Sequence, residues 1–221
     1  MTETVAVSAG RRHRWSDWIG LLFYFASAVG LYRGSPQLGL LMLPSIAHEV
    51  LIGTAFLLRP PPRRRTTGLF PRAMGYIHTF FIVVFLQVAA RWHPEWVTAT
   101  ANENAKLAGT YLWLVSSVLG LWPLWYLRHS FSLEPEARTL VVSGPYRLAR
   151  HPVYTVYILT LVGIWLRTLS VPFLIALLVW VGLLLIRVHY EEEVLAAAFP
   201  EYRDYQRRVG PFGPKLVKRA S

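Results

Sequence analysis

Six apolar stretches of nearly membrane-spanning length constrain this chain more than any other feature. A helix needs about 20 apolar residues to cross the ~30 Å hydrocarbon core of a bilayer. The stretches occupy residues 15–33, 38–58, 73–90, 107–127, 153–167 and 171–188. The fifth is short and is joined to the sixth by only four residues, so these two are predicted to form a tight helical hairpin. The sequence therefore predicts an all-α polytopic membrane bundle of about five to six transmembrane helices.

The distribution of positive charge predicts the orientation in the membrane. The net charge is +11, but the basic residues flank the apolar stretches and do not form one soluble basic face, so nucleic acid is not the expected partner. If the N-terminus is cytoplasmic, 19 of the 23 lysines and arginines lie on the inner side. The outer side then keeps only Arg33, Arg91, Lys106 and Arg167. The positive-inside rule predicts this topology, with both termini cytoplasmic in an inner or endoplasmic-reticulum-type membrane.

Composition and segment lengths indicate where chemistry is expected. Hydrophobic residues make up 54% of the chain and charged residues 16%, which excludes an ordinary water-soluble domain. The chain has no cysteine and no HExxH spacing, so no metal site is expected. Residues 1–127 are predicted to be N-terminal transmembrane helices. Residues 128–221 contain the final hairpin and two larger cytoplasmic segments, which form the predicted catalytic region.

A dense polar motif lies just before the fifth apolar stretch. Gly144-Pro145 indicates a turn, and Pro152 stands where a new helix can begin because its missing N–H costs nothing there. This arrangement predicts that Arg150, His151 and Tyr154 surround the cytoplasmic mouth of the fifth stretch. The helix N-terminus also favours an anion. Together these features suit a ligand with a carboxylate or a phosphate.

A second cluster lies at the end of the sixth stretch. Arg187 and Glu191 are four residues apart and share one helix face. Glu191, Glu192 and Glu193 are consecutive at a membrane boundary, where they should face a polar cavity or the cytosol because their desolvation is costly. Within the apolar stretches, His48, Glu49 and His78 either hydrogen-bond inside the bundle or line a substrate tunnel.

The C-terminal part of the chain resembles the isoprenylcysteine carboxyl methyltransferase family of integral membrane enzymes, within the wider group that includes phospholipid methyltransferases. The resemblance covers residues 128–214. The matching features are Thr139-Leu140-Val141, Ser143-Gly144-Pro145-Tyr146, Arg150-His151-Pro152-x-Tyr154, Glu191-Glu192-x-x-Leu195, Phe199 and Tyr202-x-x-Tyr205 with Arg208-Val209. The chain departs from the family at Val156, where a small residue is usual.

The resemblance implies that S-adenosylmethionine binds in a pocket at the cytoplasmic face. It assigns cofactor contacts to Arg138, Thr139, Leu140, Val141, Tyr146, His151, Pro152, Val153, Tyr154 and Glu191. It assigns Arg187 to the substrate side. These residue types are compatible with the cofactor, since Arg or His can hold its carboxylate, Glu191 its ammonium, and Tyr146 or Tyr154 can face its sulfonium. The lipophilic substrate is expected to enter from the bilayer, among membrane lipids.

The chemistry of the methyl acceptor decides which residues are predicted to be catalytic. A carboxylate needs no general base, and Arg187 would orient it through a charge-assisted contact. An amine or a thiol needs a base, for which Glu192 or His189 is the candidate. The sequence favours carboxyl O-methylation of an isoprenylcysteine-like acceptor, because Arg187 lies one helical turn from Glu191. A phospholipid amine and a small thiol remain open.

Two rival functions are distinguished by cofactor binding. A membrane reductase of the sterol-reductase kind would bind NADPH in a similar pocket. Such proteins tend to carry Asn at the position of Val153 and a Gly-Glu pair after the tyrosine, where this chain has Thr155-Val156. A lipid-binding scaffold with a decayed pocket would bind neither cofactor.

Overall fold

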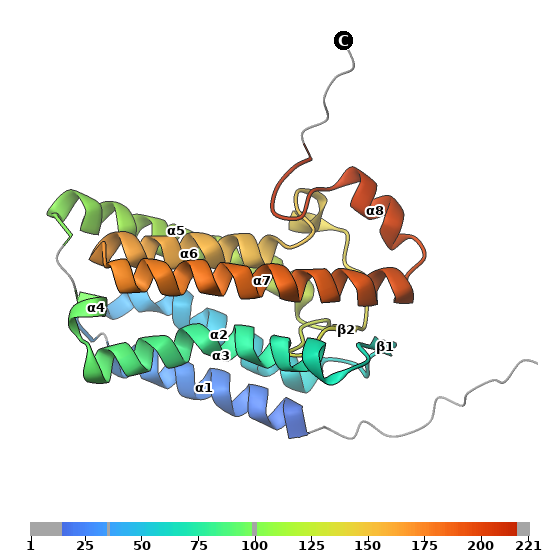
Figure 1. Ribbon diagram of the computed structural model, residues 1–221, viewed down its shortest axis with the longest axis horizontal. Helices are drawn as coiled ribbons and strands as arrows, with labels where there is room; N and C mark the ends of the chain where they lie inside the picture. The colour runs from blue at the N-terminus through green and yellow to red at the C-terminus, as the bar shows by residue number, and fades with distance from the viewer. Residues whose placement is uncertain (1–14, 35, 99–100, 216–221) are drawn as a thin grey trace, which may run out of the picture.

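The computed structural model describes residues 15–34, 36–98 and 101–215, which form a bundle of long helices (Figure 1). The long helices are α1 (Trp15–Gly34), α2 (Leu43–Leu58), α3 (Leu69–Trp92), α5 (Glu103–Leu127), α6 (Pro152–Thr168) and α7 (Val171–Ala198). The short elements are η1 (Pro36–Met42), β1 (Arg64–Arg65), α4 (Glu95–Thr98), β2 (Glu136–Ala137), η2 (Gly144–Arg147) and α8 (Tyr202–Arg208). The predicted all-α membrane bundle is confirmed.

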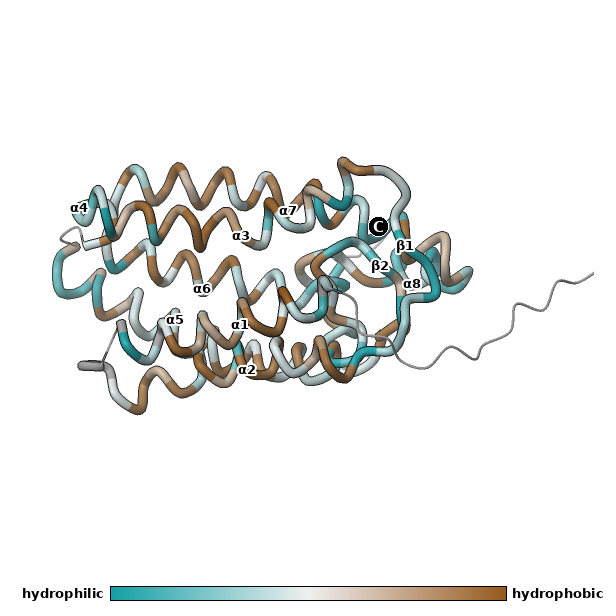
Figure 2. Tube along the Cα trace, turned by 90° about the horizontal axis from the view of Figure 1, so that it is seen from below, coloured by the Kyte–Doolittle hydropathy of each residue, from teal (hydrophilic) through white to brown (hydrophobic). Residues whose placement is uncertain are grey.

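Four helical segments in the described residues are long and apolar enough to cross a membrane: Gly39–Leu58, α3, α5 and α7. The apolar part of α1 (Asp17–Gly30) and helix α6 are shorter. Hydrophobic residues follow the length of the helices, whereas hydrophilic residues gather around β1, β2 and α8 (Figure 2). The chain is an integral membrane protein, and its fifth apolar stretch is short, as predicted.

The two ends of the bundle carry different structures. Helix α8 and strands β1 and β2 lie at one end, here called the pocket end, and α4 lies at the other (Figure 1). Helix α1 begins at the pocket end as well. Arg33, Arg91, Lys106 and Arg167 belong to the helix termini of the α4 end. The four basic residues predicted for the outer side thus share one end of the bundle, whereas Arg11, Arg12, Arg14, Lys218 and Arg219 of the predicted inner set lie outside the described residues. The cytoplasmic location of the pocket end stays a prediction.

Helices α5 and α6 pack backbone to backbone through two glycines. A Cβ atom on Gly109 would lie 2.5 Å from the carbonyl oxygen of Gly163, and one on Gly163 would lie 2.7 Å from the backbone nitrogen of Trp113. Small residues allow this approach, which is the usual basis of helix association in a bilayer. The contact holds α6 against α5, and it thereby positions the predicted site residues at the N-terminus of α6.

The hairpin between α6 and α7 turns at Leu169, which adopts the left-handed conformation (φ 49°) as the C-cap of α6. Ser170 then caps α7, because its side chain accepts a hydrogen bond from the backbone nitrogen of Phe173. Helix α7 continues ten residues beyond the predicted end at residue 188. The polar residues after Val188 remain helical, so Glu191 and Glu192 project from a helix that extends past the apolar core.

A two-residue antiparallel pairing ties the two halves of the chain together at the pocket end. Strand β1 pairs with β2 in the register Arg64 with Ala137 and Arg65 with Glu136. The backbone nitrogen of Arg63 also donates to the carbonyl of Ala137 at 2.8 Å. The basic loop between α2 and α3 is therefore fastened to the segment that precedes the predicted cofactor residues.

Candidate functional site

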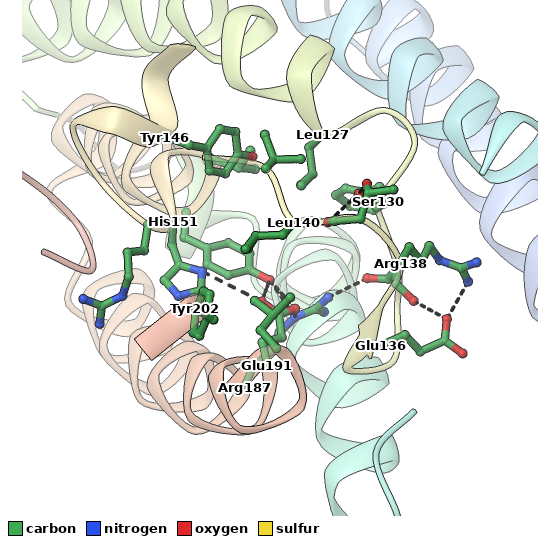
Figure 3. Close-up of a pocket in the computed structure, with 18 of the residues that line it drawn as sticks. Leu127, Ser130, Glu136, Arg138, Leu140, Tyr146, His151, Arg187, Glu191 and Tyr202 are labelled. Atoms are coloured by element: carbon green, nitrogen blue, oxygen red, sulfur yellow. Dashed lines mark hydrogen bonds and ion pairs between the residues drawn. The ribbon is translucent and has the colours of Figure 1, made fainter. Parts of the chain in front are cut away.

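A pocket of about 100 Å³ lies at the pocket end, between the loop after α5, the start of α6 and the end of α7 (Figure 3). It is lined by Leu127, Ser130, Phe131, Ser132, Glu134, Glu136, Arg138, Thr139, Leu140, Val141, Tyr146, Arg150, His151, Val153, Tyr154, Arg187, Glu191, Leu195, Tyr202 and Tyr205. These residues come from segments far apart in the sequence. The hairpin and the close α5–α6 contact bring them together.

Arg187 is the central cation of the site. Its Nε donates to Glu191 Oε1 at 2.9 Å and to the Tyr154 hydroxyl at 2.8 Å, and the Tyr154 hydroxyl donates in turn to Glu191 Oε1 at 2.7 Å. The side chain is 4% exposed. A buried charge needs such partners, because an unpaired one is strongly destabilising. Figure 3 shows Arg187 and Glu191 directed toward each other inside the pocket.

The remaining nitrogens of Arg187 bind α3 and the loop after α5. Nη1 donates to the carbonyl of Gly75 at 3.2 Å and to the hydroxyl of Thr79 at 3.0 Å. Nη2 donates to the carbonyl of Ser132 at 2.7 Å. A guanidinium has five N–H groups, so within the described residues one N–H, on Nη2, is left for a ligand.

A second buried ion pair forms the opposite wall. Arg138 Nη2 contacts Glu136 Oε2 at 2.6 Å, and Nη1 donates to the carbonyl of Pro60 in the basic loop. Arg65 Nε lies 3.2 Å from Glu136 Oε1. Burial and the nearby Arg59 lower the pKa of the Arg138 guanidinium. The N-terminal half of the chain therefore contributes to the position of a predicted cofactor residue.

Glu192 lies in a polar cluster behind the pocket. It accepts hydrogen bonds from Arg150 Nε at 2.7 Å, from Gln206 Nε2 at 2.9 Å and, when that nitrogen carries the proton, from His151 Nε2 at 2.9 Å. It is absent from the residues that line the pocket. This position does not suit the predicted role of general base, since the carboxylate is engaged elsewhere. Its contacts indicate that it positions Arg150 and His151.

Two tyrosines of α8 close the pocket. The Tyr205 hydroxyl donates to the backbone carbonyl of Tyr146 at 2.5 Å. Burial raises the pKa of Tyr205 to about 12, so the hydroxyl keeps the proton that it donates. Burial likewise raises the pKa of Tyr146. The contact holds α8 over η2.

Most of the residues that the resemblance assigned to the cofactor line this one pocket. Arg138, Thr139, Leu140, Val141, Tyr146, His151, Val153, Tyr154 and Glu191 do so, together with Arg187. Pro152 begins α6 and is absent from the lining. The sequence did not single out residues 130–136, which carry no motif, or assign a role to Tyr202 and Tyr205. The Tyr202-x-x-Tyr205 spacing was nevertheless part of the resemblance, and it could have identified these two tyrosines as pocket residues.

The pocket has the chemistry needed to hold S-adenosylmethionine. Arg138 Nε and the Tyr202 hydroxyl are buried without a hydrogen-bond partner in the described residues, and both side chains line the pocket. Native proteins rarely leave such groups unsatisfied, so each indicates a polar ligand. The pocket thus complements an amino acid that carries both charges and an attached ring system. Glu191 can pair with the ammonium, the cations Arg138 and Arg187 suit the carboxylate, and the apolar Leu140 and Val141 suit the ring system.

Comparison with known proteins identifies the family that this part of the chain matches. Residues 105–202 match the phospholipid methyltransferase family, which is the family of isoprenylcysteine carboxyl methyltransferase-like membrane methyltransferases. The match begins inside α5, before the predicted boundary at residue 128, and ends in α8. It confirms the resemblance for this part of the chain.

Two curated proteins are similar to more than half of the chain. The cobalt-zinc-cadmium resistance protein CzcN of Cupriavidus metallidurans is 32% identical over 139 residues, which are 62% of this chain and 60% of that protein. The nickel-cobalt-cadmium resistance protein NccN of Alcaligenes xylosoxydans xylosoxydans is 29% identical over 136 residues, 61% of this chain and 60% of that protein. The chain thus spans about 60% of the length of these relatives.

Proposed function

We propose that this protein is an S-adenosylmethionine-dependent methyltransferase that acts on a lipophilic acceptor at the membrane. The observation that carries the proposal is the single pocket that collects Arg138, Tyr154, Arg187 and Glu191 within the segment that matches the family. Its unpartnered polar atoms support a bound polar ligand there. The pocket end is the proposed cytoplasmic side, from which a soluble cofactor can enter.

Different residues of the pocket bind different parts of the cofactor. Glu191 holds the ammonium group of the cofactor, and Arg138 and the Tyr202 hydroxyl supply hydrogen-bond donors to its other polar atoms. Leu140, Val141 and Tyr146 form its apolar wall, as the family resemblance implies. Glu192 acts indirectly, because its contacts fix Arg150 and His151 at the mouth of the pocket.

When bound, the cofactor supplies an electrophilic methyl group on a sulfonium. The protein then has to place an acceptor atom in line with that methyl group and exclude water, and such positioning is a large part of catalysis in a two-substrate reaction. Tyr154 and Arg187 mark the inner end of the pocket, toward the bundle. We therefore place the transfer beside them, with the acceptor arriving from the bilayer.

The test is a calorimetric titration of the detergent-purified protein with S-adenosylhomocysteine. The wild type is expected to bind, and Glu191→Gln is expected to bind at least about tenfold more weakly, a loss of about 1.4 kcal/mol. Tyr202→Phe should weaken binding by a smaller factor without loss of folding, because it removes only an unpartnered hydroxyl.

The matched controls lie outside the pocket. Glu193 is exposed on the same helix and contacts His189, so Glu193→Gln should leave affinity unchanged, as should Tyr111→Phe on the exposed face of α5. Absence of binding by the folded wild type would refute the proposal. Binding of NADPH in a parallel titration would then favour the reductase alternative.

A further inference from the structure

A second cavity, here called the chamber, lies between the membrane helices of the bundle and has polar side chains within a mostly apolar wall. Its volume is about 220 Å³. Hydroxyl, imidazole and carboxyl groups from five helices line it: Ser27, Ser45, His48, Glu49, Thr79, Ser117, Tyr157 and Thr160. Polar side chains inside a membrane are costly and usually functional. From the sequence, His48 and Glu49 were expected either to hydrogen-bond inside the bundle or to line a substrate tunnel.

A smaller cavity of about 70 Å³, here called the junction, shares wall residues with both the chamber and the candidate cofactor pocket. The junction shares Tyr24, Thr79, Tyr157 and Trp180 with the chamber. It shares Phe131, Tyr154 and Arg187 with the pocket. The junction therefore lies between the chamber and the proposed site of methyl transfer.

His78 is the side chain at the junction whose polar atoms have no protein partner. It lies on α3, is 4% exposed, and both its ring nitrogens are buried without a hydrogen bond in the described residues. Its ring centroid lies 4.8 Å from that of Trp180 and 6.0 Å from that of Tyr154. Two unsatisfied nitrogens in the interior cost free energy, so the arrangement indicates a ligand that bonds to them.

The contacts of Arg187 argue against a carboxylate as the methyl acceptor. A carboxylate acceptor needs a cation with free N–H groups, whereas Arg187 already donates to five protein oxygens and keeps one N–H. A bidentate contact with a second carboxylate would displace several of these bonds. His78 instead offers a nitrogen lone pair, which suits an acceptor atom that carries a hydrogen.

We propose that His78 accepts the proton of the methyl acceptor, and that the acceptor is an amine or a thiol whose polar group lies at the junction. This inference rests on the proposed methyl transfer. The N–H or S–H bond breaks and its proton passes to a ring nitrogen of His78, while a lone pair of the nucleophile forms the bond to the methyl carbon. The bond from that carbon to the sulfonium sulfur breaks, and its electron pair stays on the sulfur. The net charge of the site is conserved, because the sulfonium becomes a neutral thioether while His78 becomes a positively charged imidazolium.

The first test is binding without turnover. The chain contains seven histidines, so ¹⁵N-histidine labelling of the full chain gives a resolvable set of ring resonances, and the His78 signal is the one missing from His78→Gln. His78→Asn serves for assignment if the glutamine variant does not fold. Octanethiol, octylamine and octanoate, which share one chain length, are then added without a methyl donor. We expect the thiol or the amine to shift the His78 resonance and octanoate to leave it in place.

The second test is methyl transfer to the same three compounds from radiolabelled S-adenosylmethionine. His78→Gln is expected to lower kcat for the thiol or the amine by about 100-fold or more, the usual contribution of a general base. Its affinity for S-adenosylhomocysteine should stay unchanged, since His78 does not line the candidate cofactor pocket. The matched control is His93→Gln at the other end of the bundle, where His93 contacts Glu95.

The outcomes separate the two proposals. If the wild type binds S-adenosylhomocysteine but methylates octanoate as well as the others, or if none of the three shifts the His78 resonance, the role of His78 is refuted and the proposed function stands. An unchanged kcat in His78→Gln has the same meaning. Absence of S-adenosylhomocysteine binding refutes the proposed function, and the role of His78 with it.

Discussion

The pocket and the chamber both have polar groups in their walls, and both leave some of them unpartnered, among them Arg138 Nε and the Tyr202 hydroxyl in the pocket. They differ in that ion pairs form part of the wall of the pocket. In the pocket, the charges of Arg187, Glu191 and Glu136 are paired within the protein at hydrogen-bond distance. In the chamber and the junction, Thr160, His48 Nε2 and both nitrogens of His78 have no hydrogen-bond partner among the described residues. Paired charges keep a site assembled when it is empty, whereas unpartnered neutral groups leave bonds for a ligand to make. The comparison indicates that ion pairs preform the pocket, and that both cavities keep hydrogen bonds for a ligand to make.

The largest expected effect is the loss of the central cation of the pocket. Arg187→Met leaves the half-buried Glu191 without its cation and removes one donor each from the carbonyls of Gly75 and Ser132 and from the hydroxyl of Thr79. Breaking a buried pair from one side costs about 3–5 kcal/mol, so the thermal unfolding midpoint in detergent should fall steeply. Arg208→Met, on the exposed face of α8, is the control. A midpoint close to that of the wild type would contradict the description of a preformed pocket.

A medium effect is expected at the α5–α6 contact, which supports both sites. Gly163→Ala places a Cβ atom 2.7 Å from the backbone nitrogen of Trp113, and such overpacking costs about 1–3 kcal/mol. Because Trp113 and Leu161 line the chamber while Val153 lines the pocket, both sites should be disturbed. The measurement is thermal stability together with S-adenosylhomocysteine affinity.

Gly182→Ala is the matched control for that substitution. Gly182 lies in α7, and a Cβ atom there meets nothing within 4 Å. Alanine is the better helix former by up to about 1 kcal/mol, so this variant should be as stable as the wild type or slightly more stable. Equal behaviour of the two glycine variants would show that the α5–α6 approach is not tight.

The smallest effect, with the opposite sign, is expected in the chamber. Thr160→Val replaces an unpartnered buried hydroxyl with a methyl group of similar size, so the empty protein should gain up to about 1 kcal/mol. Thr155→Val is the contrasting variant, since its hydroxyl donates to the carbonyl of Phe212 at 2.9 Å and its loss should destabilise. If Thr160→Val destabilises as much as Thr155→Val does, the hydroxyl of Thr160 has a partner and the comparison between the two sites fails there.

The sequence predicted the helices well, because apolar length is a local property. Helix α5 ends at Leu127, where the apolar stretch was predicted to end, and α6 and α7 both begin within one residue of the prediction. The end of α7 was missed by ten residues, since a charged run such as residues 189–193 can continue a helix or end it. The β1–β2 pairing has two residues in each strand and therefore no detectable periodicity.

The candidate site was predictable partly from the pattern of residues and partly from the resemblance. The cluster around Arg150 and His151 was visible from the sequence, and the structure confirms that these residues lie at the start of α6. The engagement of Glu192 by Arg150 and Gln206 was not visible, because it depends on the fold of the chain after α7. The isolation of His78 depends on packing between α3 and α7, which a local pattern does not encode.

The β1–β2 pairing has a consequence for synthesis of the protein. The ribosome makes residues 64–65 well before residues 136–137, and N-terminal segments of a chain generally fold first. During that interval the loop after α2 has no strand to pair with, and the carbonyl of Pro60 has no Arg138 to bind it. A nascent chain that stops within α5 would already possess α1, α2 and α3 but neither wall of the pocket. Truncated products of this kind would occupy the membrane without acquiring the proposed activity.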